Sequence, residues 1–340
     1  MDVSVNAPKG ISNLGNTCYL NACIQIFTEL KPLTNIIKTS AIQNQTKIET
    51  LLWKNWQDIL NIMSSPNNNT DKKEMLCPNG FIQAIQTISK SKKLSFFNDC
   101  NNQEDVSEFI LFFIDSLHEC ISREITVSIC GHSENETDNF AIEAFKKIKS
   151  TLEKQYSEIL DQFYGVSISS IHNKEKEIQS RQFETFMLLD LPIPNQPATL
   201  NDCIKEYIRP ELLDGDNKWY NDKTKEYEVV EKFITFWSFP KILIICLKRN
   251  GGDGSKNSTF IDYPLELDLR TFVVGYKSSE YVYDLAGICA HVGNPNNGHY
   301  TAFVKKNNEW YFCNDEKIQW VENLIHLKCK DAYCLFYVKK

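Results

Sequence analysis

The sequence of 340 residues lacks any apolar run of the roughly 18–20 residues that a membrane-spanning helix needs. Residues 1–9 contain no hydrophobic segment of the kind found in secretory signal peptides. An excess of positive charge is also missing, because the formal net charge is −7. These absences predict a soluble intracellular protein of the cytoplasm or nucleus, with neither a membrane nor a nucleic acid as partner.

No two of the 12 cysteines form a Cys-x-x-Cys pair, the spacing that supplies thiolates to zinc sites and redox motifs. Scattered cysteines fit a reducing compartment, in which they stay unpaired. Cys23, Cys120 and Cys246 are predicted to be core residues rather than ligands.

Internal repeats are also missing, and the Gly-rich stretch 251–255 reads as a mobile loop rather than a domain linker. With 42% apolar residues, the chain can bury a large core. It is expected to form a single domain over residues 1–340, and to be a monomer.

Two kinds of hydrophobic pattern divide the chain. Helical spacing of apolar residues predicts helices in the first half, at residues 17–30, 48–63, 80–89, 105–119 and 141–163. Short apolar runs separated by turn residues predict strands in the second half, at 184–191, 226–235, 241–247, 281–291, 300–305, 309–314 and 332–338. Helices followed by mostly antiparallel strands indicate an α+β fold, with an active site in the cleft between the halves.

One cysteine stands out near the N-terminus. The polar segment 10–17 leads directly into the predicted helix 17–30, which places Cys18 in the first helical turn. A helix start favours a thiolate, and a neighbouring histidine can lower a cysteine pKa to roughly 3.5–7.5. Cys18 is therefore a candidate nucleophile that needs a histidine from elsewhere in the chain.

His299 is the candidate partner among six histidines, because it follows the Gly-rich turn 293–298 and leads into a strand. Asn314 and Asp315 follow at the end of the next predicted strand. Cysteine hydrolases need a base for the thiol proton and an amide or carboxylate that fixes the imidazole tautomer. Neighbours on a strand point to opposite faces unless the strand has just ended, so Asn314 ranks first and Asp315 stays open as the alternative.

The sequence segments around these residues resemble those of a known protein family. Segments 10–21 and 298–315 closely resemble the cysteine and histidine boxes of the ubiquitin-specific proteases, and segments 103–109, 242–249 and 332–337 resemble further stretches of that family in the same order. The resemblance implies a papain-like α+β fold built as a hand. It places a helical thumb at about 9–164, an antiparallel β palm at 165–200 and 236–340, and inserted β fingers at about 201–235.

The resemblance also implies roles for single residues. Cys18 would be the nucleophile, His299 the general base, and Asn314 or Asp315 the residue that orients the imidazole. Asn13 matches the position whose amide donates to the oxyanion, a contribution of about 3–4 kcal/mol. Without the resemblance, Asn13 would read as a turn residue.

Substrate recognition is implied in the same way. Gln103, Asp105 and Glu108 match the region that faces the Arg-containing tail of ubiquitin, and Gly298 and Tyr300 match a narrow channel for its terminal Gly-Gly. Loop 293–298 would gate that channel. The alternative for Asp105 and Glu108 is purely structural, since acidic residues stabilise the first turn of any helix.

One departure from the family concerns zinc, which many members bind in the fingers through two Cys-x-x-Cys pairs. The matching stretches here, 171–175 and 219–222, contain no cysteine, which predicts metal-free fingers. The resemblance thus implies a cofactor-free deubiquitinating enzyme whose partner is ubiquitin or ubiquitinated protein. Two alternatives remain: a protease for another ubiquitin-like modifier, and a ubiquitin-binding scaffold with a misaligned cleft.

Overall fold

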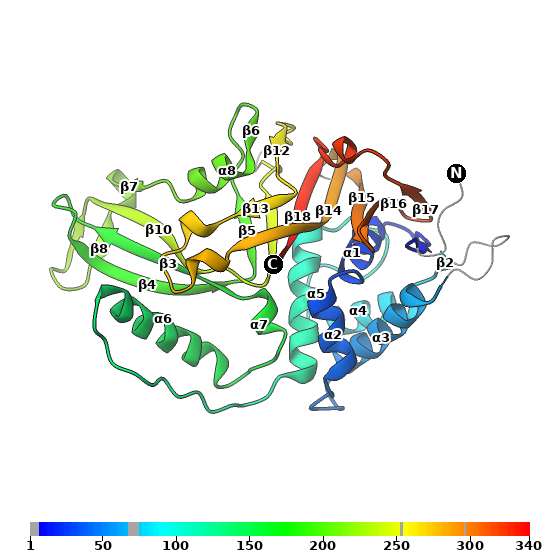
Figure 1. Ribbon diagram of the computed structural model, residues 1–340, viewed down its shortest axis with the longest axis horizontal. Helices are drawn as coiled ribbons and strands as arrows, with labels where there is room; N and C mark the ends of the chain where they lie inside the picture. Colours follow the sequence, from blue (N-terminus) through cyan, green and yellow to red (C-terminus); the bar gives the residue numbers. More distant parts are fainter. Residues whose placement is uncertain (1–6, 67–74, 252–253, 296) are drawn as a thin grey trace.

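The computed structural model describes residues 7–66, 75–251, 254–295 and 297–340. The two loops predicted at 251–255 and 293–298 each contain residues outside these ranges, namely 252–253 and 296. Most of the helices gather at one end of the molecule, beside the larger of two sheets (Figure 1). The helical part contains α1 (Cys18–Phe27), α2 (Lys31–Thr39), α3 (Thr50–Ser64), α4 (Asn79–Ser91) and α5 (Val106–Ile121).

An eight-stranded sheet packs against these helices. Its main path runs β17 (Lys317–Trp320), β16 (Glu309–Asn314), β15 (Asn297–Lys306), β14 (Val282–Asn294), β18 (Ala332–Lys339), β11 (Ile242–Leu247) and β5 (Leu188–Leu191), with β13 (Glu266–Asp268) paired to β14. Helix α1 lies against β14, β15 and β16, and their side chains share one apolar core. The first helix of the chain therefore meets strands that follow it by more than 250 residues.

A second sheet of four strands forms the other end of the molecule (Figure 1). Its order is β4 (Ile178–Phe186), β3 (Gly165–His172), β10 (Val230–Ser238) and β7 (Glu211–Leu213). Helix α6 (Glu136–Leu152) packs on it through a small core that includes Ala144, Ile168 and Trp237. The remaining elements are short: β1 (Gly10–Ile11), β2 (Met75–Leu76), α7 (Leu160–Phe163), β6 (Ala198–Thr199), α8 (Leu200–Tyr207), β8 (Trp219–Asn221), β9 (Glu226–Glu228), β12 (Ile261–Asp262) and four 3₁₀ turns.

The α+β division is confirmed, with local corrections. The helix predicted at 17–30 ends at Phe27, and Pro32 lies in the first turn of the next helix, α2, where a proline fits. The helix predicted at 141–163 is two helices, α6 and α7, separated by an extended bridge between Arg123 and Tyr156. Strand β3 and helix α8 were not predicted, although Leu200, Cys203, Ile204 and Tyr207 of α8 follow helical spacing.

The predicted cysteine chemistry needs one correction. Cys23, Cys120 and Cys246 are buried core residues as predicted. Cys246 is not unpaired, however, because it forms a disulfide with Cys334. The two residues lie directly opposite each other on β11 and β18, with Cα atoms 4.3 Å apart, so their side chains meet on the same face of the sheet.

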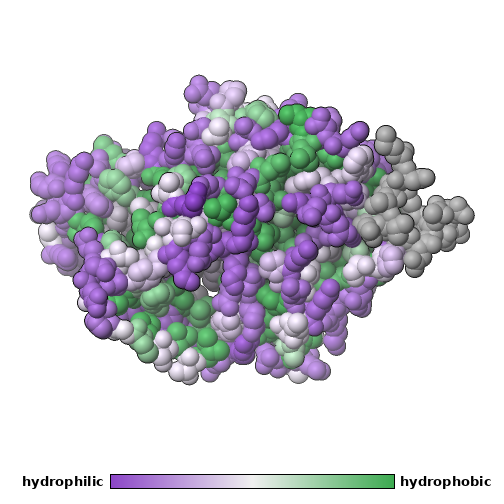
Figure 2. Space-filling model, viewed as in Figure 1, coloured by the Kyte–Doolittle hydropathy of each residue, from purple (hydrophilic) through white to green (hydrophobic). Residues whose placement is uncertain are grey.

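The surface and the helices bear on the membrane prediction. Among the described residues, no helix combines the length and apolarity needed to cross a membrane. The face shown in Figure 2 is mainly hydrophilic, with smaller hydrophobic patches between the polar side chains.

Candidate active site

Cys18 is the first residue of α1, and its side chain is buried at 4% exposure against the eight-stranded sheet. The approach to the helix is fixed by Thr17, whose hydroxyl donates to Asn13 Oδ1 at 3.1 Å and accepts from the Leu14 N–H at the same distance. The predicted position in the first helical turn is thus confirmed.

The electrostatic state of Cys18 differs from the expected one. Burial raises the pKa of the thiol above its ordinary value of 9.0, and the nearby Asp315 carboxylate adds to this rise. Hydrogen bonds from the backbone N–H groups of Tyr300, Tyr19 and Cys18 itself act in the opposite direction but do not overcome the burial. Within the described residues, the Cys18 thiol shares no hydrogen bond with His299. In this conformation, burial therefore favours the neutral thiol over an activated thiolate.

His299 lies inside β15 rather than in a turn before it, because β14 and β15 continue as a hairpin up to the pair Asn294 and Asn297. Its Nε2 is 2.8 Å from Asn314 Oδ1, at the end of the neighbouring strand β16. An amide oxygen only accepts, so the Nε2 carries the proton and Nδ1 keeps its lone pair. The His299 side chain is 41% exposed, which leaves Nδ1 available as a base.

Asp315 occupies the turn directly after β16, with a left-handed φ of 49°. Because the strand has ended, its carboxylate does not point away from Asn314. Asp315 Oδ2 is 3.7 Å from His299 Nε2, but it accepts a hydrogen bond from Asn13 Nδ2 at 2.9 Å. Its Oδ1 accepts another from Asn21 Nδ2 at 2.8 Å. The better hydrogen bond to His299 thus comes from Asn314, and Asp315 is bound to two asparagines.

Asn21 is a site residue that the sequence analysis missed. It is 2% exposed and lies one turn after Cys18 on α1, so both side chains face the same strands. Its position three residues after the nucleophile was the available signal.

Gln103 is held against the backbone of Gly298. Its Nε2 donates to the Gly298 carbonyl and its Oε1 accepts from the Gly298 N–H, both at 2.7 Å. This pair connects the segment before α5 to the residue that precedes His299. Tyr300, the residue after His299, is buried and packs against His291 with tilted rings whose centroids are 4.4 Å apart.

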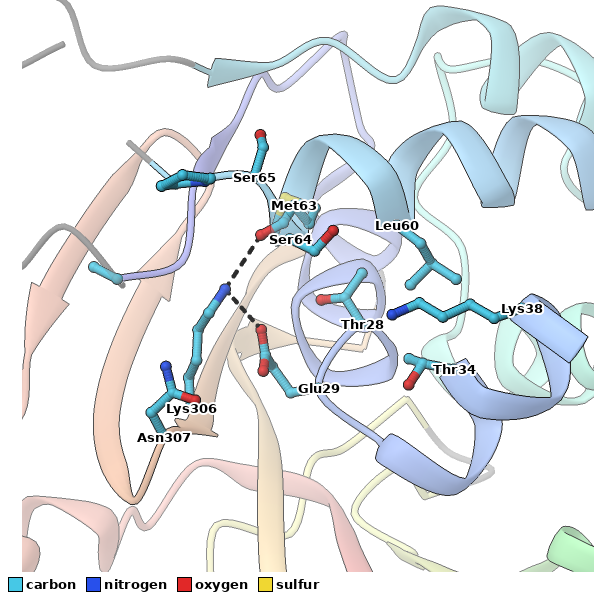
Figure 3. Close-up of a pocket in the computed structure, with 12 residues that line it drawn as sticks. Thr28, Glu29, Thr34, Lys38, Leu60, Met63, Ser64, Ser65, Lys306 and Asn307 are labelled. Carbon is cyan, nitrogen blue, oxygen red and sulfur yellow. Dashed lines mark hydrogen bonds and ion pairs between the residues drawn. The ribbon is translucent and has the colours of Figure 1, made fainter. Parts of the chain in front are cut away.

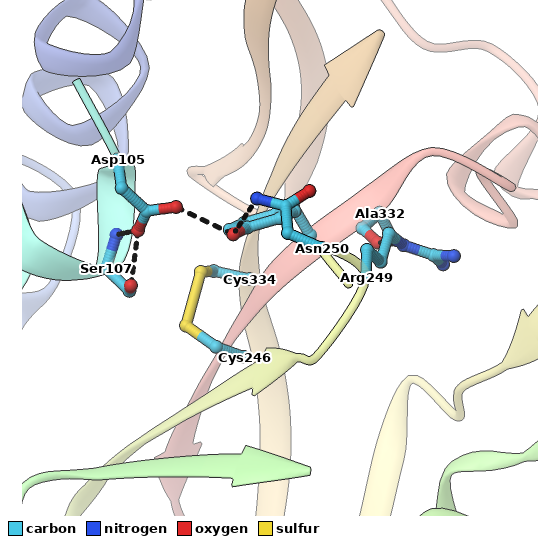
Figure 4. Close-up of a disulfide and its surroundings, with 8 residues drawn as sticks. Asp105, Ser107, Cys246, Arg249, Asn250, Ala332 and Cys334 are labelled. Carbon is cyan, nitrogen blue, oxygen red and sulfur yellow. Dashed lines mark hydrogen bonds between the residues drawn. A yellow bond between two sulfur atoms is a disulfide. The ribbon is translucent and has the colours of Figure 1, made fainter. Parts of the chain in front are cut away.

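The two acidic residues predicted to face a substrate tail differ in their surroundings. Asp105 caps α5 by accepting from the Ser107 N–H at 2.7 Å, and its Oδ2 accepts from the Tyr333 hydroxyl at 2.7 Å (Figure 4). Glu108 is exposed in the first turn of α5, and its pKa is raised by partial burial and by the neighbouring carboxylates of Asp105 and Glu104. Glu108 is thus the freer of the two for an incoming cation.

The prediction of metal-free fingers concerns the distal hairpin of β8 and β9. Among the described residues, no group of three His, Cys, Asp or Glu side chains could hold a metal ion. The hairpin of β8 and β9 is closed by the ring pair Tyr220 and Tyr227, 5.2 Å apart, and by a bond from Asn221 Nδ2 to Glu228 Oε1 at 2.8 Å.

A polar pocket of about 370 Å³ lies elsewhere, between the ends of α1 and α3, helix α2 and the turn after β15. Lys306 reaches into it and pairs with Glu29 at 3.1 Å, and it also donates to the Met63 carbonyl at 3.2 Å (Figure 3). None of the residues predicted for the active site lines this pocket.

Comparison with known proteins defines the class to which this fold and site belong. A model of the family described as ubiquitin carboxyl-terminal hydrolase matches residues 9–337. The chain belongs to this family, as the sequence motifs predicted.

Individual relatives agree with this assignment. The chain is 28% identical to ubiquitin carboxyl-terminal hydrolase 4 of Saccharomyces cerevisiae over 96% of its length, but it spans only 39% of that protein. It is 30% identical to ubiquitin carboxyl-terminal hydrolase 2 of Gallus gallus, with 98% of this chain and 94% of that protein covered.

Solved structures confirm the fold. A SAGA DUB module with Ubp8, Sgf11, Sus1 and Sgf73 bound to monoubiquitin matches with a TM-score of 0.74 at 20% identity, covering 99% of this chain and 70% of that one. The same module bound to ubiquitin aldehyde matches with a TM-score of 0.73 at 21% identity, covering 99% and 70%.

Proposed function

We propose that this chain is a deubiquitinating cysteine protease that cleaves the bond after the C-terminal Gly-Gly of ubiquitin. The observation that carries the proposal is the convergence of Cys18 at the start of α1 with the bonded pair His299 and Asn314 on β15 and β16. Membership of the ubiquitin carboxyl-terminal hydrolase family and structural neighbours bound to ubiquitin support the substrate class.

In the proposed reaction, His299 Nδ1 takes the proton of the Cys18 thiol as the sulfur attacks the carbonyl carbon of the terminal glycine. The tetrahedral intermediate collapses, the C–N bond breaks, and the imidazolium gives its proton to the departing amine. Water then hydrolyses the thioester with His299 again as base, which regenerates the thiol and frees the ubiquitin carboxylate. Asn314 keeps the imidazole in the reactive tautomer through its 2.8 Å bond.

The open choice between Asn314 and Asp315 divides into two roles. Asn314 orients His299. Asp315 instead orients Asn13, whose second amide hydrogen and the Cys18 backbone N–H are the proposed donors to the oxyanion. Asp315 is therefore a positioning residue in this proposal.

Because the Cys18 thiol is neutral and not bonded to His299 in this conformation, we propose that substrate binding completes the site. Glu108 is the proposed contact for an arginine of the ubiquitin tail, while Asp105 holds the start of α5 and Tyr333. The flanking residues Gly298 and Tyr300 would form the channel for Gly-Gly.

The test is reaction of the purified chain with ubiquitin that carries a thiol-reactive group at its C-terminus. Wild type should form a covalent adduct and Cys18→Ala should not. Cys23→Ala is the matched control, because Cys23 is a buried cysteine on the same helix, and this variant should label like wild type.

Other outcomes identify the alternatives. Binding of ubiquitin without labelling would favour the inactive scaffold. Labelling only by probes built from another Gly-Gly modifier would indicate that this modifier, rather than ubiquitin, is the substrate.

A further inference from the structure

The hairpin that carries His299 is fastened by a lysine from a different part of the chain. Lys256 Nζ donates to three acceptors on β14: His291 Nδ1 at 2.9 Å, the His291 carbonyl at 2.7 Å and the Gly293 carbonyl at 3.0 Å. Gly293 pairs with Gly298, and Val292 pairs with His299, in the register of β14 and β15. Lys256 therefore binds the part of β14 that pairs with His299, the proposed general base.

His291 connects Lys256 to the residues on both sides of His299. His291 is 2% exposed, and its ring packs at a tilt of 31° against that of Tyr300. Its Nε2 lies so near Gly298 that a Cβ added to this glycine would be 2.1 Å away. Any rotation of the His291 ring would thus displace Gly298 or Tyr300, the two chain neighbours of His299.

Hydrogen bonds also hold the backbone next to Lys256 in place. The buried Arg249 guanidinium donates to the carbonyls of Asn257 and Thr259, at 2.9 and 3.0 Å, and to the Ala332 carbonyl at 2.7 Å. These bonds fix the segment directly after Lys256 to β18. From the other side, Gln103 holds Gly298 by its two bonds of 2.7 Å.

The surroundings of the Lys256 ammonium group do not favour the stability of the fold. Among the described residues, Lys256 makes no ion pair, and its three acceptors are all neutral. Burial lowers its pKa despite the more distant Asp331 carboxylate. A partly buried ammonium without a carboxylate partner is expensive, so a role beyond packing accounts better for its position.

We propose that Lys256 is a positioning residue for the reaction, which acts through His291 to set the His299 imidazole in reach of Cys18. This inference rests on the proposed function. Among the described residues, Lys256 makes no hydrogen bond or ion pair with Cys18 or His299, so its effect should fall on the chemical step rather than on ubiquitin binding.

The test compares Lys256→Met with Lys47→Met in hydrolysis of a fluorogenic ubiquitin C-terminal amide by the full chain. Lys47 is the matched control because its Nζ also makes three hydrogen bonds, to the Glu119 carbonyl, Glu119 Oε2 and Ser122 Oγ, at 2.9, 2.8 and 3.3 Å. Glu119 lies near the opposite end of α5 from Asp105, about 20 Å along the helix.

Lys256→Met should lower kcat by about 10- to 100-fold, because displacement of a catalytic group by about 1 Å has effects of this size, and should leave KM within about threefold. Lys47→Met should leave both constants within about twofold of wild type. Lys256→Arg keeps a cationic donor and should recover much of kcat. If the methionine variant fails to fold by circular dichroism, Lys256→Gln replaces it under the same criteria.

Two results would overturn the inference: an unchanged kcat in folded Lys256→Met or Lys256→Gln, or an equal loss in Lys47→Met. Both differ from failure of the proposed function, in which wild type itself would not hydrolyse the substrate and both proposals would fall together.

Discussion

Asn13 and Asp315 lie 302 residues apart in the chain, yet Asn13 Nδ2 donates to Asp315 Oδ2 at 2.9 Å. The same carboxylate accepts from Asn21 on α1. Two asparagines that flank Cys18 in sequence are thereby joined to the turn that follows Asn314. The contact connects the proposed oxyanion donor to the strand that orients the proposed base.

A first prediction concerns this contact. Asp315→Ala should lower kcat by about 100-fold, because Asn13 loses the partner that directs its amide toward the oxyanion. Steady-state hydrolysis by Asp315→Ala, Asn13→Ala and the double variant measures the coupling. The double variant should lose little more than either single variant, since the two residues act as one unit. Fully multiplicative losses would show that Asp315 and Asn13 act independently.

Asn314 is expected to act on the imidazole directly. Asn314→Ala removes the acceptor of the 2.8 Å bond, so His299 can rotate or adopt the unreactive tautomer. The expected loss in kcat is about 100-fold or more, with ubiquitin affinity by calorimetry unchanged. Full activity in Asn314→Ala, together with loss of activity at every pH in Asp315→Ala, would identify Asp315 as the orienting residue instead.

The state of Cys18 predicts a pH dependence in the absence of substrate. Burial raises the pKa of this thiol above 9.0, so the reactive thiolate is scarce at neutral pH and increases as pH rises beyond 9. The rate of Cys18 alkylation by chloroacetamide, followed by peptide mass spectrometry, should climb through that range. Peptide resolution is needed because Cys77 and Cys130 are exposed and will also react. A rate that is already constant from about pH 7 would mean that the free enzyme holds an activated thiolate.

His291 predicts a pH dependence of stability. Burial and the adjacent Lys256 ammonium lower the pKa of His291 from 6.5 to about 4, although Asp105 and Asp331 act in the opposite direction and the nearby His299 adds to the lowering. The unfolded chain therefore binds more protons between these values, and the stabilising contribution present above pH 6.5 is lost as pH falls toward 4. The melting temperature should decline over this window. His291→Phe should show a shallower decline, and an unchanged slope would contradict the assignment.

A final prediction concerns the distal hairpin. Closure by Tyr220 with Tyr227 and by Asn221 with Glu228 predicts folding without zinc. A strong chelator should leave the melting temperature and ubiquitin hydrolysis unchanged, and elemental analysis should find less than stoichiometric zinc. Tyr227→Ala should instead lower ubiquitin affinity or local stability without a metal effect. One zinc per chain after extensive dialysis would contradict this prediction.

The sequence by itself determined the α+β division, the family, and the placement of Cys18 at the start of a helix. These features depend on local patterns: helical spacing after Thr17, alternation and turn residues in the second half, and contiguous motifs around Cys18 and His299. The same local character explains the errors. Helix α2 was missed beside the helix predicted at 17–30, and β3 and α8, which were also missed, are only eight residues long each.

The tertiary structure alone decided which groups meet. That Asn314 bonds to His299 while Asp315 bonds to Asn13 depends on where β16 ends and on the left-handed φ of Asp315. Strand register likewise brought Cys246 opposite Cys334. The hydrogen bonds from Lys256 to β14 also form only because the fold brings distant segments together. A sequence pattern reports the periodicity of one segment, whereas pairing across the chain is fixed only when all segments pack into one core, so these contacts could not be inferred from residue order.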